Sequence, residues 1–372
     1  MIYLDNAATT RPNGIALESA KQFNYDVFFN PSALYRHGIS VHKEINGARD
    51  FLCSALGTSE HEVVFTSCGS EADNQAIFGV AKRGTVVTTA GEHSAVFKCF
   101  SELKNRGMNV VFAPLKKDGS VNEESLLRAV EETKATFVSV VHVNNETGAI
   151  NDVAKLSAAI KKINSSCVFH SDGVQAFGKI RFVLPRTVDL YAVSAHKIGG
   201  LKGTGALFKR KGFNLPPLIW GGGQENGLRS GTEIVYGIKV FEYAARERYS
   251  HLEEYYGHAM HLNRVFRELL DLGCFRILSA ENASPYILTL SANPLKGEVL
   301  LHLLEEADII VGNGSACSSR NRYSRVIEAC GYHNDDGIIR ISFSPDNTEE
   351  EIRIAAQKLN ECAQKLRKIM LS

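Results

Sequence analysis

Strand-like and helix-like segments alternate through the first half of this chain, and this alternation constrains its fold more than any other feature. Runs rich in β-branched and aromatic residues suit a pleated sheet and predict strands at 63–66, 86–89, 110–113, 137–143 and 168–171. Apolar residues at helical spacing predict helices at 38–56, 72–82, 95–106, 123–132 and 153–163. The repetition is typical of a mostly parallel sheet with helices on both faces, whose ligands bind beyond the carboxyl ends of the strands.

A second, smaller unit is predicted after the alternating region. Two apolar runs within 188–209 predict a pair of buried strands around a tight glycine loop, and 232–256 predicts one long bridging helix. Beyond it the pattern indicates an α+β unit, with strands near 287–290, 309–311 and 338–343 and a final helix at 348–368. With 372 residues, 44% of them hydrophobic, the chain suits one large α/β domain plus a smaller one.

Charge and composition exclude several classes of protein. A formal net charge of +1 without a long basic block argues against nucleic-acid binding. No apolar run reaches the ~18 residues of a membrane span, and the first residues, M-I-Y-L-D-N, show no secretory signal. The eight cysteines include no C-x-x-C pair, which predicts reduced thiols in a cytoplasmic protein rather than a disulfide framework or a metal site.

A lysine directly follows the apolar strand predicted near 188–194, in the sequence Ser194-Ala195-His196-Lys197. Partial burial would favour its neutral amine, because desolvation disfavours an ammonium ion. A neutral lysine amine can form a Schiff base, so Lys197 is a candidate for covalent catalysis. An ordinary solvated loop lysine is the alternative that this segment alone leaves open.

Other chemically useful side chains also follow predicted strands. Gly69-Ser70 opens a helix, where backbone N–H groups and a hydroxyl can hold a phosphate, although an ordinary helix cap fits as well. His93 follows the next strand and could stack on a flat ring, move protons or serve as a structural histidine.

Amides and a carboxylate follow two further strands. The side chains of Asn144-Asn145 can bond a phenolic oxygen or form a turn. Asp172, with Gln175 three residues on, could keep a pyridine nitrogen protonated or cap a helix. A phosphate cradle, a ring-stacking side chain, an amide, a carboxylate and Lys197 at the strand ends of one sheet together predict a pyridoxal phosphate site.

Longer motifs point to a family. Over essentially its whole length the chain resembles the cysteine desulfurases of the class V aminotransferase group. The matching segments are 3–10, 30–32, 65–74, 92–93, 142–148, Asp172 with Gln175, 194–197, 229–232 and 314–318. The resemblance implies an α/β fold of fold-type I pyridoxal phosphate enzymes, with a mainly parallel seven-stranded sheet, helices on both faces and a smaller α+β domain.

The resemblance also implies how the chain is divided and which residues bind the cofactor. An N-terminal segment, 1–15, joins the small domain; a large cofactor-binding domain spans 16–250, and a small domain with the catalytic cysteine spans 251–372. The implied cofactor-binding residues are Gly69, Ser70, His93, Asn145, Asp172, Gln175, Ser194, His196, Lys197 and Thr232.

Individual roles follow from the same resemblance. Lys197 forms the Schiff base and moves protons at the substrate α-carbon, Asp172 pairs with the pyridine nitrogen, and His93 stacks on the ring. Gln175 and Asn145 approach the ring oxygen, while Gly69, Ser70, Ser194 and His196 hold the phosphate. Thr232 reaches the phosphate of a neighbouring subunit, which implies a homodimer. Arg340, with Asn145 nearby, grips the carboxylate of L-cysteine through a two-point contact.

Cys317 is the candidate nucleophile. It lies in a small, polar, glycine-bearing segment that is predicted to be mobile, and a reactive thiolate needs such access. The resemblance implies that Cys317 attacks the sulfur of the cofactor-bound cysteine, leaving a persulfide and releasing alanine. Its Gly-Ser-Ala-Cys form is similar to the long-loop branch, which passes the persulfide to an acceptor protein for iron–sulfur cluster assembly or tRNA thiolation.

Two alternatives remain. A selenocysteine lyase, or another amino-acid lyase or aminotransferase, would use the same scaffold, and a non-catalytic partner-binding subunit would use only the fold. The retained Lys197, Asp172 and Cys317 argue against the second alternative. The chain departs from the family pattern at Tyr35, Leu201 and 344–345, and none of these positions removes a chemical group that the reaction requires.

Overall fold

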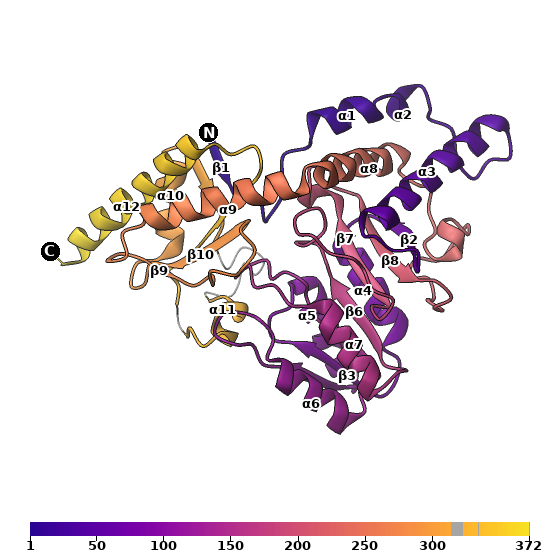
Figure 1. The fold of residues 1–372 in the computed structure, drawn as a ribbon, viewed down its shortest axis with the longest axis horizontal. Coiled ribbons are helices and arrows are strands. Elements are labelled where there is room, and N and C mark those ends of the chain that lie inside the picture. The colour runs from indigo at the N-terminus through magenta and orange to yellow at the C-terminus, as the bar shows by residue number, and fades with distance from the viewer. Residues whose placement is uncertain (314–322, 334, 372) are drawn as a thin grey trace.

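The structure, a computed structural model, describes residues 1–313, 323–333 and 335–371. Its larger part is built around a seven-stranded sheet, and its smaller part around a three-stranded and a two-stranded sheet (Figure 1). The helices α8 (Val235–Ser250) and α9 (Leu252–Leu269) run from the larger part to the smaller one.

The seven-stranded sheet confirms the predicted fold class. Its strands lie in the order β2, β8, β7, β6, β5, β3, β4. The five strands from β7 to β4 are parallel, whereas β8 runs antiparallel to both of its neighbours. The bounds are β2 His61–Thr66, β3 Thr85–Thr89, β4 Asn109–Ala113, β5 Phe137–Ser139, β6 Val168–Asp172, β7 Leu190–Ser194 and β8 Gly205–Arg210.

Helices cover both faces of this sheet. Val87 packs with α3, α6, α7 and α8 in one core, whereas Val86 packs with α4 and α5 in another. Successive residues of a strand point to opposite faces, so the two helix groups lie on opposite sides. The remaining bounds are α1 Gly14–Ala20, α2 Gln22–Tyr25, α3 Arg36–Ala55, α4 Gly69–Val80, α5 Ser94–Asn105, α6 Glu123–Thr133 and α7 Val153–Ile163.

The helices that follow strands differ at their first turns. Asn122 and Asp152 cap α6 and α7, because their side chains accept the backbone N–H groups of the first turn. By contrast, α4 begins after Cys68 without a capping side chain. Its first N–H groups therefore remain able to bind an anion.

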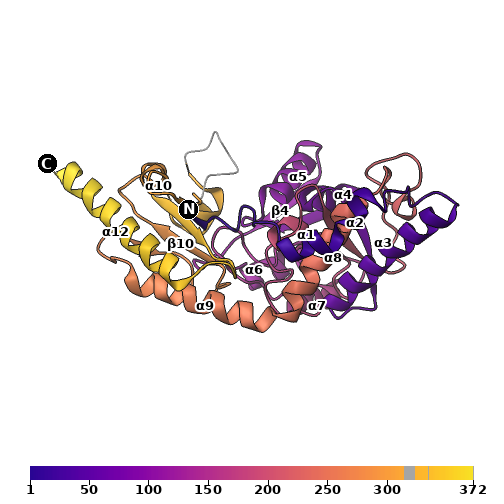
Figure 2. The ribbon, with the colours of Figure 1, turned by 90° about the horizontal axis from the view of Figure 1, so that it is seen from above.

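The smaller part combines two short sheets with its longer helices on one side. The strands β12, β10 and β9 form an antiparallel sheet, and β1 pairs in parallel with β11. Helices α9 and α12 pack side by side along this sheet (Figure 2). The bounds are β1 Ile2–Leu4, β9 Arg276–Ile277, β10 Ile287–Ser291, α10 Gly297–Glu305, β11 Ile309–Val311, α11 Arg325–Ala329, β12 Ile338–Ser342 and α12 Glu349–Leu371.

The N-terminal segment crosses from the smaller part to the larger one. Leu4 pairs with Val311 in the β1–β11 ladder. Thr10 then donates its backbone N–H to the carbonyl of His196, and Asn13 does the same to Gly199. The first residues of the chain therefore lie against the glycine loop that follows β7.

Two predictions of local structure are wrong. The single helix predicted at 232–256 is two helices, because the backbone at His251 leaves the helical region, at φ −119° and ψ 20°. The strand predicted at 137–143 ends at Ser139, although Val140 and His142 still donate their backbone N–H groups to the carbonyls of His170 and Asp172 on β6. None of the described helices combines the length and the apolar character needed to span a bilayer.

Candidate active site

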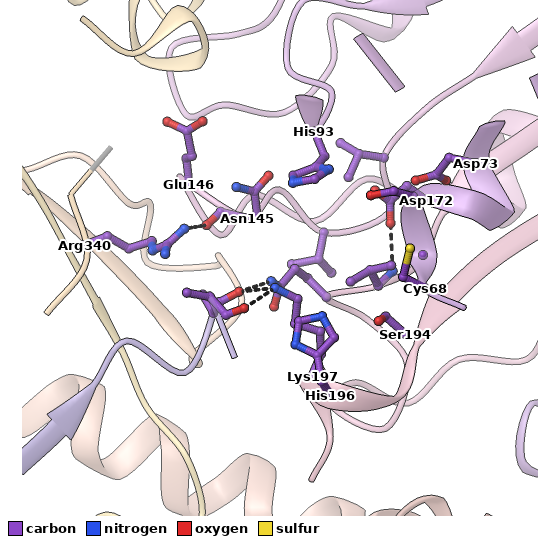
Figure 3. A pocket seen from close by; sticks show the side chains of 18 of the residues that line it. Cys68, Asp73, His93, Asn145, Glu146, Asp172, Ser194, His196, Lys197 and Arg340 are labelled. Carbon is purple, nitrogen blue, oxygen red and sulfur yellow. Dashed lines mark hydrogen bonds between the residues drawn. The ribbon is translucent and has the colours of Figure 1, made fainter. Parts of the chain in front are cut away.

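A cavity of about 360 Å³ lies at the carboxyl ends of the parallel strands, between the two parts of the molecule (Figure 3). It is lined from β6 and β7, from the start of α4, from the loops after β3 and β5, and from β12. The predicted residues that line it are Gly69, Ser70, His93, Asn145, Asp172, Gln175, Ser194, His196, Lys197 and Arg340.

Lys197 lies in a short 3₁₀ turn, Ala195–Lys197, immediately after β7. Its Nζ donates to the backbone carbonyl oxygens of Ala7 at 2.7 Å and of Ala8 at 2.8 Å. The lysine is half-buried. The N-terminal segment, which carries the matching motif at 3–10, therefore holds the amine of Lys197 at the cavity wall.

Asp172 is the last residue of β6 and is only 4% exposed. Its Oδ1 accepts the backbone N–H of Val174 at 2.9 Å. Burial raises the pKa of Asp172, whereas the nearby His93 and Lys197 act in the opposite direction. A protonated ring nitrogen would supply the opposite charge that a buried carboxylate requires.

His93 caps α5, and its Nδ1 accepts the backbone N–H of Ala95 at 3.2 Å. The proton of the neutral ring is therefore on Nε2. Burial lowers the pKa of His93, which favours this neutral form. The imidazole lies across the cavity from Lys197 (Figure 3), so a flat ring bonded to the amine could lie against it.

The residues around the start of α4 fit a phosphate group. Ser194 Oγ is buried and has no hydrogen-bond partner among the described residues, and it lies close to the uncapped helix start. A Cβ on Gly69 would lie 2.7 Å from Val174 Cγ2, so glycine permits this close approach. Burial, with Lys197 nearby, lowers the pKa of His196 to about 4, which leaves a neutral imidazole with one N–H to donate. This donor set and the Asp172 carboxylate fit pyridoxal phosphate.

Arg340 reaches the cavity from β12 and is 5% exposed. Its Nη1 donates to the backbone carbonyl of Asn145 at 2.9 Å, and its Nη2 to Asp5 Oδ1 at 2.8 Å. The Nε of Arg340 and the Oδ1 of Asn145 are buried without partners among the described residues. A guanidinium with an unused N–H can bind the carboxylate of a small substrate.

Sequence reasoning assigned no role to three acidic residues near the predicted set, of which Asp73 and Glu92 are buried and Glu146 is partly buried. Asp73 and Glu146 line the cavity, and Glu92 is buried beside it. Burial raises the pKa of each of the three, that of Glu92 to about 8. Asp73 follows Gly69 by four residues, so helical spacing places both on one face of α4 and could have identified Asp73.

Two predicted site residues, Thr232 and Cys317, are not among the described residues that line this cavity. Thr232 lies in a separate cleft with Ser67 and Arg229. Cys317 lies outside the described residues. Asn313, the last described residue before that stretch, does line the cavity.

Comparison with known proteins agrees with this geometry. The family model of the class V aminotransferases matches residues 2–354. A NifS/IcsS protein homolog of Lactobacillus delbrueckii subsp. bulgaricus is 36% identical over 366 residues, 94% of each chain. The cysteine desulfurase IscS of Methanosarcina thermophila is 33% identical, over 98% of this chain and 93% of its own. A solved NifS-like protein superposes with a TM-score of 0.91 at 34% identity, over 98% of this chain and 99% of its own. The chain therefore belongs to the class V aminotransferase family.

Proposed function

We propose that this chain is a pyridoxal phosphate-dependent cysteine desulfurase that converts L-cysteine to L-alanine and retains the sulfur as a persulfide on Cys317. The observation that carries the proposal is a single cavity lined by Lys197, Asp172, His93 and Arg340. The full-length similarity to cysteine desulfurases supports the same reaction.

The Asp172 side of the cavity would hold the cofactor. When bound, pyridoxal phosphate supplies an electron sink for the substrate α-carbon. Asp172 would keep the ring nitrogen protonated, and His93 would lie against the ring. Gln175 and Asn145 would approach the ring oxygen. The phosphate ligands in this proposal are Gly69, Ser70, Ser194 and His196.

Lys197 would bind the cofactor covalently and would also transfer protons at the substrate α-carbon. Its amine would hold the cofactor covalently and, when free, would take a proton from the substrate α-carbon. The carbonyl oxygens of Ala7 and Ala8, which accept its N–H groups at 2.7 and 2.8 Å, would keep the released amine at the cavity wall. The proton could then be returned to the product from the same nitrogen.

Arg340 would orient the substrate through its carboxylate. The contacts to Asn145 and Asp5 fix the plane of the guanidinium, and its Nε is buried without a partner among the described residues. A fixed, charge-assisted donor orients an anion better than a flexible one, because less side-chain entropy is lost on binding.

The transfer of sulfur to Cys317 requires no oxidant or reductant beyond the substrate itself. The Cys317 thiolate attacks the substrate sulfur, and the new S–S bond forms as the Cβ–S bond of the substrate breaks. The substrate carbon receives the electron pair of that bond and a proton, which gives alanine. Cys317 keeps the transferred sulfur as a persulfide for an acceptor protein of iron–sulfur assembly or tRNA thiolation.

The assembly and the location belong to the same proposal. A homodimer, with Thr232 reaching the partner's phosphate, would cover large apolar side chains that the single chain exposes, such as Leu34 at 92% and Trp220 at 79%.

The seven described cysteines are free thiols, which suits the cytoplasm. The domain division at 1–15, 16–250 and 251–372 is likewise proposed.

The test is to supply L-cysteine to the protein loaded with pyridoxal phosphate and to measure alanine. Cys317→Ala should lower alanine formation by roughly 10³-fold or more, because the nucleophile is lost. Cys53→Ala, which removes a half-buried thiol on α3, is the matched control and should retain activity. A wild-type protein that forms no alanine contradicts the proposal, and activity on selenocysteine alone would favour a selenocysteine lyase.

A further inference from the structure

A buried lysine lies behind the cavity, next to Gln175. Lys179 is 4% exposed, and its Nζ donates to Gln175 Oε1 at 2.7 Å. Burial, together with the positive charges of Lys197, Arg248 and Arg340, lowers the pKa of Lys179 well below its usual range. A lysine in such surroundings costs stability relative to an apolar side chain of similar size, so its position requires a local reason.

The contacts of Gln175 supply that reason. An amide has one oxygen that accepts and one nitrogen that donates. The Oε1 of Gln175 accepts from Lys179, and its Nε2 donates to the carbonyl oxygen of Ala7 at 2.8 Å. A flipped amide would place its oxygen against the carbonyl oxygen of Ala7 and would remove the acceptor to which Lys179 Nζ now donates. The amine and the carbonyl therefore select one orientation of the amide.

The selected orientation matters because Gln175 lines the cavity. With Oε1 occupied by Lys179, the group that Gln175 can offer to a ligand is the second hydrogen of Nε2. The same Ala7 carbonyl also accepts from Lys197 Nζ at 2.7 Å. Lys179, Gln175, Ala7 and Lys197 thus form one continuous path of hydrogen bonds along the cavity wall.

We propose that Lys179 is a positioning residue that fixes the amide of Gln175, so that Gln175 donates an N–H to the ring oxygen of bound pyridoxal phosphate. The inference rests on the proposed function, because the ring oxygen belongs to the proposed cofactor. Lys179 itself does not line the cavity as described, so its effect on the cofactor passes through Gln175. Without the amine, only the Ala7 carbonyl opposes a flip that turns the amide oxygen toward the oxygen of the cofactor, so the flipped orientation becomes easier to reach.

A double-mutant cycle tests this dependence. Lys179→Met, Gln175→Leu and the double variant are titrated with pyridoxal phosphate, and the affinity and the visible spectrum of the bound cofactor are measured. Lys179→Met should weaken binding about tenfold, the effect of one lost hydrogen bond in a buried site, and should shift the spectrum. In the Gln175→Leu background the same change should have no further effect on either readout, because residues that act through one contact are not additive.

Matched variants separate this effect from a general loss of structure. Lys209→Met removes a lysine of equal exposure, 4%, on β8 and should leave cofactor affinity unchanged. Lys179→Arg keeps a donor and should restore most of the affinity. Lys179→Gln, which keeps a shorter polar head group, completes the cycle should Lys179→Met fail to fold.

The outcomes distinguish the two proposals. If the losses of Lys179→Met and Gln175→Leu multiply in the double variant, or if Lys179→Met binds the cofactor like the wild type with an unchanged spectrum, the inference is overturned alone. A wild-type protein that binds pyridoxal phosphate but forms no alanine from L-cysteine overturns the desulfurase activity and leaves the positioning role standing. A wild-type protein that binds no pyridoxal phosphate overturns both.

Discussion

The two ends of the cavity are built in different ways. The Asp172 end, with Gly69 and Ser194, consists of strand ends and a helix start within one sheet. The Arg340 end joins three distant segments, because Arg340 on β12 contacts both Asp5 and Asn145. The first end is held by a continuous hydrogen-bonded sheet, and the second depends on how the smaller part packs against the larger one.

This difference separates binding the cofactor from selecting the substrate. A rigid sheet edge can place a carboxylate, a hydroxyl and an amine at fixed distances, as a pre-organised site requires. At the Arg340 end, a substitution in one of the three segments can change the substrate contacts and leave the sheet edge that holds the cofactor unchanged. We therefore expect substitutions at the Asp172 end to affect the cofactor itself, and those at the Arg340 end to affect mainly the affinity for substrate.

The largest effect is expected for Lys197→Ala. Loss of the amine removes both the covalent link and the proton carrier, so alanine formation should fall by roughly 10³-fold. The visible absorbance of the linked cofactor should disappear at the same time. Lys202→Ala, an exposed lysine of the same glycine loop, is the control and should keep both. Survival of the absorbance in Lys197→Ala would mean that another lysine holds the cofactor.

Arg340→Gln should have an intermediate effect that is confined to the substrate. Loss of a charge-assisted contact should raise KM for L-cysteine by about 10- to 100-fold, with a smaller change in kcat and an unchanged cofactor spectrum. Cysteamine lacks the carboxylate, so wild type and variant should differ much less with it. An equal loss of activity with L-cysteine and with cysteamine would show that Arg340 supports the structure of the site. It would contradict the proposal that the Arg340 end acts mainly on the substrate.

The last effect concerns stability and leaves activity aside: a pH dependence of unfolding at the Asp172 end. Glu92 has a pKa of about 8 in the folded chain against 4.5 for an unhindered carboxyl, so between these values the folded state binds a proton that the unfolded state lacks. The free energy of unfolding contributed by Glu92 therefore falls as pH rises through this window, by up to about 1.4 kcal/mol per pH unit. Glu92→Gln should flatten this slope in urea unfolding of the unloaded protein.

The Gln variant is close in shape and keeps an oxygen for the donors of Thr89 and Val141, which the Oε1 of Glu92 now accepts. Glu124→Gln, on the exposed side of α6, serves as the control and should leave the slope unchanged. A slope that persists in Glu92→Gln would assign the titration to another buried group, such as Asp73.

Much of the fold and of the Asp172 end could be predicted from the sequence. The helix predicted at 153–163 has the observed bounds of α7, and ten predicted residues line one cavity. The break at His251 was not predictable, because the apolar spacing continues on both sides of it. The contacts of the Ala7 carbonyl with Gln175 and Lys197 could not be predicted either, because every residue has a backbone oxygen and the residue type does not indicate which one accepts a given hydrogen bond.

The sequence by itself determined which chemical groups the chain carries and that several of them follow parallel strands, because local propensity and spacing depend on neighbouring residues. Only the tertiary structure decided that β1 pairs with β11 and thereby brings Asp5 to Arg340 and Ala7 to Lys197. Such contacts join residues far apart along the chain, and the burial of the two cores, not any local pattern, selects them.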